Sequence, residues 1–197
     1  MKQLLLLMLL TFTTIASANE EVLSFPFTPD NVNDWRYFSD QVMGGVSEGQ
    51  VSLEQDGDKV FIRLSGNVRT DNNGGFIQLR TTTSLSNKPL MFKLLHNSNK
   101  EGKKLKGIRL KVKGNGEKYH IFIQTTIFYR LPTSYKIATF DTSPNWETVE
   151  IPFNKFKKLK DNIDSNISAK DIKTFGIVAY GRDFKSDLSV SSVEFYY

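Results

Sequence analysis

The residues Gly45-Val46-Ser47-Glu48-Gly49 fit the G-x-S-x-G pattern in which a serine acts as the nucleophile of a hydrolase. That chemistry requires a strand, a sharp turn and then a helix, so that the serine hydroxyl stands exposed above a sheet. The residues after Ser47 instead alternate in polarity on both sides of an Asp56-Gly57-Asp58 turn, which is typical of a β-hairpin. The sequence therefore disfavours a catalytic role for Ser47.

Few other residues have the types and spacing that catalysis or metal binding needs. His96 and His120 are the two histidines, and their spacing fits neither an HExxH nor an HxH zinc site. Asp56 and Asp58 could offer oxygen ligands to calcium, but a two-residue hairpin turn supplies too few of them. We predict no catalytic residues, no metal site and no cofactor.

The elements that must position any site are predicted to be strands. Apolar and polar residues alternate with a period of two, which indicates strands with one buried and one solvent-facing side. Segments of this kind are 51–53, 60–64, 76–80, 108–112, 119–129, 135–140, 147–151, 175–180 and 189–196. Helical periodicity of useful length is missing, apart from short turns near 28–34 and 169–172. The pattern predicts an all-β, antiparallel β-sandwich.

The N-terminal residues predict export. Lys2 is followed by an apolar run over Leu4–Leu10 and then by Ala16-Ser17-Ala18, the pattern of a secretory signal peptide cleaved near Ala18. Residues 19–197 then fit one domain, which we expect to be periplasmic or secreted. The chain has no cysteine, so its stability must come from an ordinary hydrophobic core.

The charge of the chain is mildly positive, with a formal net charge of +5 for the 197 residues. Lysines gather in two stretches, at Lys100, Lys103, Lys104 and Lys106, and at Lys155, Lys157, Lys158 and Lys160. Such stretches are usually solvated surface, although they could also make peripheral contact with an anionic membrane or a polysaccharide. Nucleic acid is not an expected partner of an exported domain.

Several segments together resemble the complex I intermediate-associated protein 30 family. They are "WRYFSDQVMGGVSEG", "LSGNVRTDNNGGFIQLRT", "GIRLKVKGNGEKYHIFIQ", "YKIATFDTSPNWETVEIPFNKF" and "FGIVAYGRDFKSDLSVSSVEF". The resemblance implies a galactose-binding-domain-like β-sandwich, or jelly roll, and no catalysis. Mitochondrial members of the family are assembly factors that act as chaperones for a respiratory complex, whereas the signal peptide here implies a partner outside the cytoplasm. Ser47 resembles part of the family's D-x-x-M-G-G-x-S loop.

A tentative binding site follows from these motifs. We expect Trp35, Asp40, Gln41, Asn73 and Arg80 to converge near one face, where Arg80 would pair with Asp40 or hold an anionic group. The loop would be shaped by Gly44, Gly45, Ser47, Gly74 and Gly75. The alternative is that Asp40 only fixes this loop and Trp35 only fills the core.

Three functions remain open at this point. The first is a non-catalytic binding module of the cell envelope, which resembles an assembly factor or chaperone and binds a protein partner. The second is a carbohydrate-binding module, in which Tyr129, Tyr135 and Trp146 would stack on sugar rings. The third is a serine hydrolase acting through Ser47, which the strand pattern disfavours.

Overall fold

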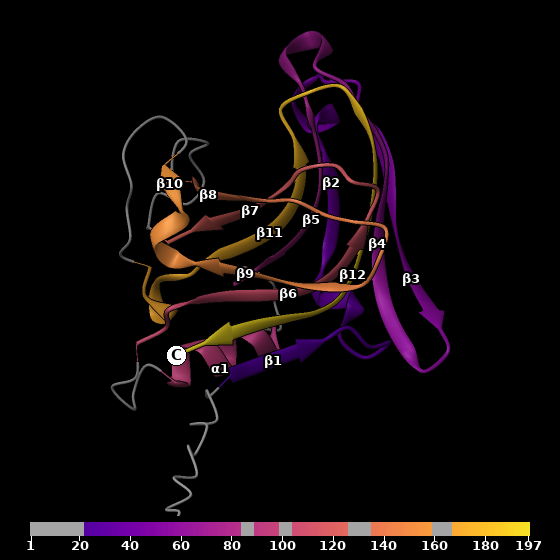
Figure 1. The fold of residues 1–197 in the computed structure, drawn as a ribbon. Helices are drawn as coiled ribbons and strands as arrows, with labels where there is room; N and C mark the ends of the chain where they lie inside the picture. The colour runs from indigo at the N-terminus through magenta and orange to yellow at the C-terminus, as the bar shows by residue number, and fades with distance from the viewer. Residues whose placement is uncertain (1–21, 84–88, 99–103, 126–134, 159–166) are drawn as a thin grey trace, which may run out of the picture.

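The computed structural model describes residues 22–83, 89–98, 104–125, 135–158 and 167–197. Several sequence predictions fall outside these ranges: the signal peptide at 1–18, the stacking role of Tyr129, and three lysines, Lys100, Lys103 and Lys160. The described residues form two antiparallel sheets of six strands each, packed face to face (Figure 1). This arrangement confirms the predicted antiparallel β-sandwich.

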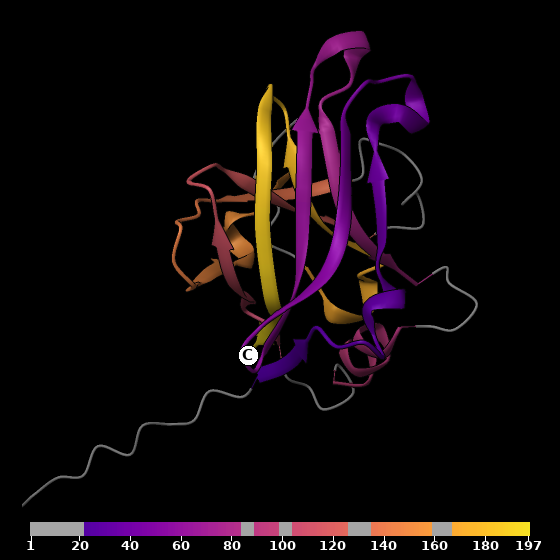
Figure 2. The same ribbon diagram turned by 90° about the vertical axis from the view of Figure 1, so that its right-hand side faces the viewer.

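The first sheet has the order β3-β4-β12-β6-β9, and β1 also pairs with β12. Its strands are β1 (Val22–Pro26), β3 (Glu48–Asp56), β4 (Lys59–Val68), β6 (Gly107–Gly114), β9 (Glu147–Pro152) and β12 (Phe184–Tyr196). Figure 2 shows β12, β4 and β3 upright and side by side. In the β3–β4 hairpin Asp56 pairs with Lys59 and Gly57 has a φ of +59°, so the predicted tight turn at Asp56-Gly57-Asp58 is confirmed.

The second sheet has the order β10-β8-β7-β11-β5-β2. Its strands are β2 (Arg36–Ser39), β5 (Phe76–Thr82), β7 (Tyr119–Gln124), β8 (Tyr135–Phe140), β10 (Lys157–Lys158) and β11 (Thr174–Tyr180). The sequence alternation predicted the long strands but not β1, β2 and β10. These three are short and lie at or near sheet edges, where half-buried residues give little contrast between the two faces.

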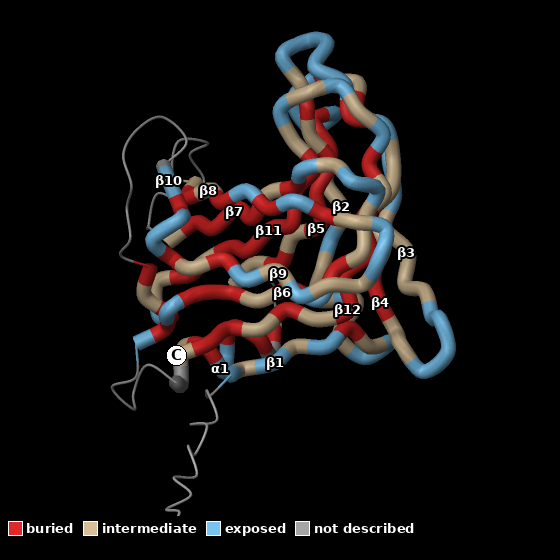
Figure 3. The backbone as a smooth tube through the Cα atoms, in the orientation of Figure 1, coloured by how far each residue is buried: buried red, intermediate tan, exposed pale blue. Residues whose placement is uncertain are grey.

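The core lies between the two sheets. It consists of the apolar side chains that point inward from each strand, at every second residue. Ile77 and Leu79 of β5 face Ile62 and Leu64 of β4 across it, and all four are at most 2% exposed. Burial follows the inner strands and fades toward the loops (Figure 3). Because side chains alternate between faces, the residues between these positions point outward, and they determine what each sheet offers to solvent.

One helix, α1 (Leu90–Ser98), was missed by the sequence prediction. It spans nine residues, too short to give a clear helical period. Met91, Phe92 and Leu95 are buried in the core, so tertiary packing stabilises it. The two predicted short turns are present as 3₁₀ turns at Val32–Asp34 and Ala169–Asp171.

Candidate functional site

Asp40 lies at the centre of a loop that joins β2 to β3. Its side chain is completely buried, and its carboxylate accepts four hydrogen bonds. One oxygen accepts the Ser47 N–H at 2.9 Å. The other accepts the Ser47 hydroxyl at 2.5 Å, the Gly75 N–H at 2.5 Å and the Phe76 N–H at 3.2 Å. Asp40 therefore ties the segment before β3 to the segment before β5.

The ionisation of Asp40 follows from these contacts. Burial raises the pKa of the carboxyl, but the hydrogen bonds from Gly75, Ser47 and Phe76 favour the anion more strongly, so the pKa lies below its usual value. No lysine or arginine in the described part of the chain forms an ion pair with Asp40. The predicted Asp40–Arg80 pair is therefore not formed, and Asp40 acts as a buried anion that holds the loop.

Ser47 is bound within the same network. Its hydroxyl donates to Asp40, accepts the Arg69 N–H at 3.0 Å and is fully buried. Neither histidine is its partner: His120 Nδ1 contacts the Thr139 hydroxyl at 3.0 Å, and His96 Nε2 contacts the Ile172 carbonyl at 3.3 Å. A nucleophilic serine needs an accessible hydroxyl and an adjacent base, so this geometry gives the hydrolase hypothesis no support.

Ser47→Ala is expected to lower the free energy of unfolding by about 1–3 kcal/mol, because a buried Asp40 oxygen and the part-buried Arg69 N–H each lose a partner. Urea denaturation measures this loss. Ser24→Ala is the matched control, since its hydroxyl bonds Glu194 at an exposed site. Equal stability of the two variants would contradict the role assigned to Ser47.

The predicted loop-shaping glycines either lie close to the Asp40 carboxylate or have positive φ values. A Cβ atom on Gly45 would lie 2.3 Å from the Asp40 carboxyl carbon, and one on Gly74 would lie 2.5 Å from a carboxylate oxygen. Gly44 and Gly75 have φ values of +89° and +119°, which other residues rarely adopt. The two glycine pairs therefore let both segments approach the buried carboxylate.

The remaining predicted binding residues do not all converge. Trp35 packs on the core, with its ring 5.1 Å from Phe27 and 5.9 Å from Phe175. Gln41 is exposed and donates from Nε2 to the Ser47 carbonyl at 3.1 Å. Asn73 has a positive φ of +58° and lies beside a groove on the second sheet. Arg80 does not line this groove, but it donates to the hydroxyl of Tyr135, which does, so the structure does not bring Asn73 and Arg80 into contact.

The groove runs over the outward face of the second sheet and has a volume of about 210 Å³. It is lined by Met43, Asn73, Gly74, Phe76, Gln78, Phe122, Tyr135, Val178 and Tyr180. These residues come from β5, β11, β7 and β8, which lie side by side in the sheet, and from the loops before β3 and β5. Met43 is 62% exposed at its rim.

Aromatic rings form much of the groove. The ring centroid of Phe122 lies 5.2 Å from that of Tyr135 and 5.3 Å from that of Tyr180. Gly176 pairs with Phe122 on one side and with Arg80 on the other, so this row of the sheet carries no side chain between them. Rings with open space beside them are suited to stacking on a flat or apolar ligand.

Polar groups without partners lie among these rings. Gln78 is 7% exposed, and its Oε1 atom has no hydrogen-bond partner in the described structure; nor has the buried Nε atom of Arg80. The Arg80 guanidinium stacks over Phe38 at 4.1 Å and donates to the Tyr135 hydroxyl at 3.3 Å. Buried polar atoms usually find partners, so the hydrogen-bonding capacity of these two enclosed atoms is left unused in the described structure.

Sequence reasoning missed Phe76, Gln78, Phe122 and Tyr180 as candidate site residues. The alternation of Phe76, Gln78 and Arg80 with Ile77 and Leu79 was a usable signal, since it places the first three on one face of β5. It could not show that this face forms a groove.

His120 lies at the edge of the groove, 5.7 Å from the Tyr180 ring. Burial, assisted by the positive charge of Arg182, lowers its pKa from 6.5 to about 4. Between these values the unfolded chain binds a proton at His120 that the folded chain does not, so acidification from pH 6.5 to 4 destabilises the fold.

His120→Gln is expected to reduce this acid sensitivity. The slope of unfolding free energy against pH should fall by up to about 1.4 kcal/mol per pH unit in the window between pH 6.5 and 4. Chemical denaturation at several pH values measures both slopes. Parallel curves for the wild type and the variant would contradict a depressed pKa at His120.

A second hollow, of about 270 Å³, lies on the outward face of the first sheet. Arg63 and Asp187 form a two-pronged ion pair there, at 2.7 and 2.8 Å. Trp146 lies on this face as well, 5.4 Å from the Phe61 ring and beneath the Lys59 ammonium at 4.6 Å. Tyr135 and Trp146, predicted together as sugar platforms, are therefore on opposite sheets.

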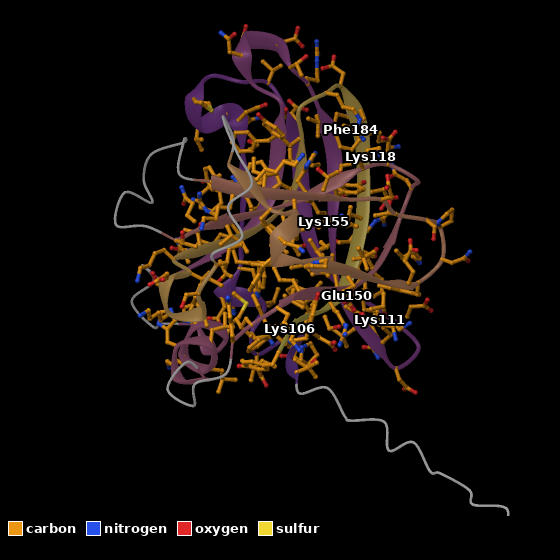
Figure 4. The ribbon with its side chains drawn as sticks, turned by 60° about the vertical axis from the view of Figure 1, so that its left-hand side comes forward. Lys106, Lys111, Lys118, Glu150, Lys155 and Phe184 are labelled. Atoms are coloured by element: carbon orange, nitrogen blue, oxygen red, sulfur yellow. The ribbon has the colours of Figure 1, made fainter. Side chains whose placement is uncertain are left out.

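A third hollow, of about 530 Å³, lies between the edges of β8 and β9 and includes Lys155 and Lys157 in its lining. Figure 4 shows Lys155 on this side of the molecule, with Glu150 of β9 nearby. Lys104 and Lys106 of the other lysine stretch are exposed. Peripheral contact of these lysines with a membrane stays a prediction.

The described ranges contain neither a metal-ion cluster nor a helix that could span a membrane. Within those ranges, no three histidine, aspartate or glutamate side chains gather closely enough to hold a metal ion. None of the helices in the same ranges has the length and apolar character needed to cross a bilayer.

Solved structures with this fold include the family 11 carbohydrate-binding module of a cellulosomal cellulase of Clostridium thermocellum. It has a TM-score of 0.62 and 14% identity, over 91% of this chain and 95% of that one. Another structure holds a Clostridium thermocellum family 11 module in complex with a β-1,3-1,4-mixed-linked tetrasaccharide, with a TM-score of 0.59 and 14% identity over 87% and 94% of the two chains.

A family 30 carbohydrate-binding module is also similar, with a TM-score of 0.51 and 14% identity over 81% of this chain and 80% of that one. These likenesses show the fold, which is the predicted galactose-binding-like jelly roll. A search of curated proteins found no match. Residues 25–190 match a family, as the motifs predicted: the chain belongs to the complex I intermediate-associated protein 30 (CIA30) family.

Proposed function

We propose that this protein is an exported, non-catalytic binding module of the cell envelope that assists the assembly of a membrane protein complex. Family membership supports a binding role over a catalytic one. The groove on the second sheet carries the proposal, because its rings line a concave surface that can receive a ligand. Met43 and Val42, 62% and 73% exposed, extend this apolar surface beyond the groove.

Export is part of the proposal. The N-terminal pattern predicts cleavage near Ala18, which would release residues 19–197 into the periplasm or the medium. N-terminal sequencing of the protein recovered from the cell envelope tests this step. A chain that retains Met1 in the cytoplasm would contradict it.

A glycan is the second candidate ligand, and a specific observation favours it. Phe76, Phe122, Tyr135 and Tyr180 supply rings for stacking on sugars, and the Arg80 guanidinium, which contacts Tyr135, offers charge-assisted hydrogen bonds to a carboxylate group. The similar modules of known structure are named as carbohydrate-binding, and one contains a bound tetrasaccharide. Their likeness to this chain supports the fold, and the groove residues support the ligand class.

The groove is tested by crosslinked capture from the native cell envelope with residues 19–197 as bait. The double variant Tyr135→Ala/Tyr180→Ala removes two half-buried rings from the groove, and Trp146→Ala removes one ring from the opposite sheet as the control. We expect one defined membrane protein to be recovered in a saturable manner, lost with the groove variant and retained with the control.

Circular dichroism and thermal melting establish that each variant is folded. If a folded groove variant recovers the same protein as the wild type, the groove is not the protein-binding site. If glycan is recovered in place of protein, and recovery depends on the groove, the carbohydrate function replaces the assembly function.

A further inference from the structure

The outward face of the second sheet has an unusual distribution of charge. The strand register assigns to this face Arg36, Phe38, Phe76, Gln78, Arg80, Thr82, Thr174, Gly176, Val178, Tyr180, His120, Phe122, Gln124, Tyr135, Ile137, Thr139 and Lys157. None of these residues is an aspartate or a glutamate, although 21 occur in the chain. The face is therefore aromatic and basic, with no negative charge of its own.

Two arginines lie next to each other at one end of the groove. Arg36 of β2 pairs in register with Arg80 of β5, so both side chains leave the same face of the sheet. Arg80 is the next outward-facing residue of β5 after Gln78, and Gln78 lines the groove. Within the described part of the chain, no carboxylate forms an ion pair with either guanidinium.

This lack of acidic partners contrasts with the other arginines of the sandwich. Arg63 pairs with Asp187, Arg109 with Glu150 and Arg182 with Glu117. Arg69 likewise pairs with Asp71 at 2.8 Å. Folding thus satisfies these arginines internally and leaves the Arg36–Arg80 pair without a counter-charge.

Arg80 is also held in place without a counter-charge. Its guanidinium carbon lies 4.1 Å from the centre of the Phe38 ring, and its Nη1 atom donates to the Tyr135 hydroxyl at 3.3 Å. Its buried Nε atom has no partner in the described structure. A guanidinium held in this way loses little side-chain freedom when it donates to an anionic group.

We propose that the groove binds an acidic glycan, with a carboxylate or sulfate group of the sugar held by Arg80 and Arg36. A sugar ring stacks on the Phe122–Tyr135–Tyr180 cluster that lines the groove. The proposal rests on the glycan-binding candidate function and specifies the class of glycan. The positive net charge of the chain assists the approach of such a polyanion.

Titration calorimetry with defined oligosaccharides tests this proposal. The probes are tetragalacturonate, its methyl ester, a sulfated oligosaccharide of similar length and a neutral β-glucan tetrasaccharide; a polyglutamate peptide represents an acidic polypeptide. We expect an acidic sugar to bind at least about 10-fold more tightly than its neutral counterparts, since charge-assisted hydrogen bonds exceed neutral ones in strength. Carboxylate and sulfate sources are distinguished by which acidic sugar binds.

Arg80→Gln is expected to weaken binding of the acidic sugar by about 10–100-fold while leaving affinity for neutral sugars within about 2-fold. Arg80→Lys keeps the charge but loses the planar fork, so an intermediate loss is expected. Lys111→Gln is the matched control, because it removes one positive charge from an exposed position on the first sheet (Figure 4). Thermal melting establishes that the variants are folded.

Salt provides a second readout. Raising the salt concentration from about 0.05 to about 0.5 M should weaken binding of the acidic sugar and leave stacking on neutral sugars nearly unchanged. If tetragalacturonate and its methyl ester bind with equal affinity, and the neutral tetrasaccharide also binds, the acidic specificity is overturned and the glycan function is retained. Binding of polyglutamate alone would overturn it in favour of a polypeptide. Absence of binding to every sugar would overturn both the specificity and the glycan function.

Discussion

Asp40→Asn is expected to lower the free energy of unfolding by about 2–4 kcal/mol. The carboxylate accepts from Ser47 N–H, Ser47 Oγ, Gly75 N–H and Phe76 N–H, all within 3.2 Å. An asparagine keeps the shape but replaces one acceptor oxygen with an amide that donates. Whichever way the amide turns, at least one backbone N–H then faces another donor in a site with no access to water.

Urea denaturation and thermal melting of residues 19–197 measure this loss, which corresponds to a fall in melting temperature of about 4–16 °C for a domain of this size. Asp141→Asn is the control, since Asp141 is exposed and forms an ion pair with exposed Lys118. A melting temperature for Asp40→Asn equal to that of Asp141→Asn would show that the buried network does not stabilise the fold.

The same network predicts the effect of acid. Because the pKa of folded Asp40 lies below its ordinary value, the carboxylate contributes stability that is present above the unfolded value of about 3.8 and is lost as the pH falls through the folded value. The stability difference between wild type and Asp40→Asn should therefore narrow at low pH.

Gly45→Ala is expected to destabilise the protein by about 3 kcal/mol or more, because the added methyl group would lie 2.3 Å from the Asp40 carboxyl carbon. The carboxylate cannot move aside without breaking bonds to Ser47 or Gly75. Gly57→Ala is the matched control: φ is +59° but no atom lies within 4 Å of an added Cβ, so only backbone strain of about 1–2 kcal/mol is expected.

A double-mutant cycle connects these two effects. Asp40→Ala removes the two nearest atoms that the Gly45 methyl group would meet, the carboxyl carbon at 2.3 Å and a carboxylate oxygen at 2.4 Å, and leaves the Asp40 Cβ at 2.7 Å. The double variant Asp40→Ala/Gly45→Ala should therefore be more stable than the sum of the single effects predicts, by about 1–3 kcal/mol. If the two single changes in unfolding free energy are strictly additive in the double variant, the absence of a side chain at Gly45 does not serve to make room for Asp40.

The candidate site has two parts that differ in how far the sequence reveals them. The Asp40 network joins Ser47, within the same motif, to Gly75 and Phe76 of a second motif. Both motifs are visible in the sequence, so the loop-shaping glycines and the structural alternative for Asp40 could be predicted. The groove combines outward residues of β5, β7, β8 and β11. Of the tentative binding residues, Asn73 and Arg80 lie at or beside this groove, while Trp35 packs on the core and Asp40 is enclosed.

The sequence by itself determined the longer strands, the turn at Asp56-Gly57-Asp58 and the class of fold. Both features are local. The alternation over Ile108–Val112 follows from the two-residue period of a strand, and the Asp56-Gly57-Asp58 turn follows from the residue types that a tight turn needs. The family motifs likewise lie along the chain and led to the CIA30 family directly. The sequence pattern did not predict the short helix α1, because packing against the core stabilises this helix and it is too short to show a clear period.

Only the tertiary structure decided which outward residues meet. The second sheet places strands in the order β10-β8-β7-β11-β5-β2, so neighbours in space are distant in the chain. Arg80 reaches Tyr135 across 55 positions, and Gly176 opens the row between Arg80 and Phe122. Strand pairing depends on long-range packing, which a period of two cannot encode. For that reason the aromatic groove and its unpaired arginines became visible only in the folded protein.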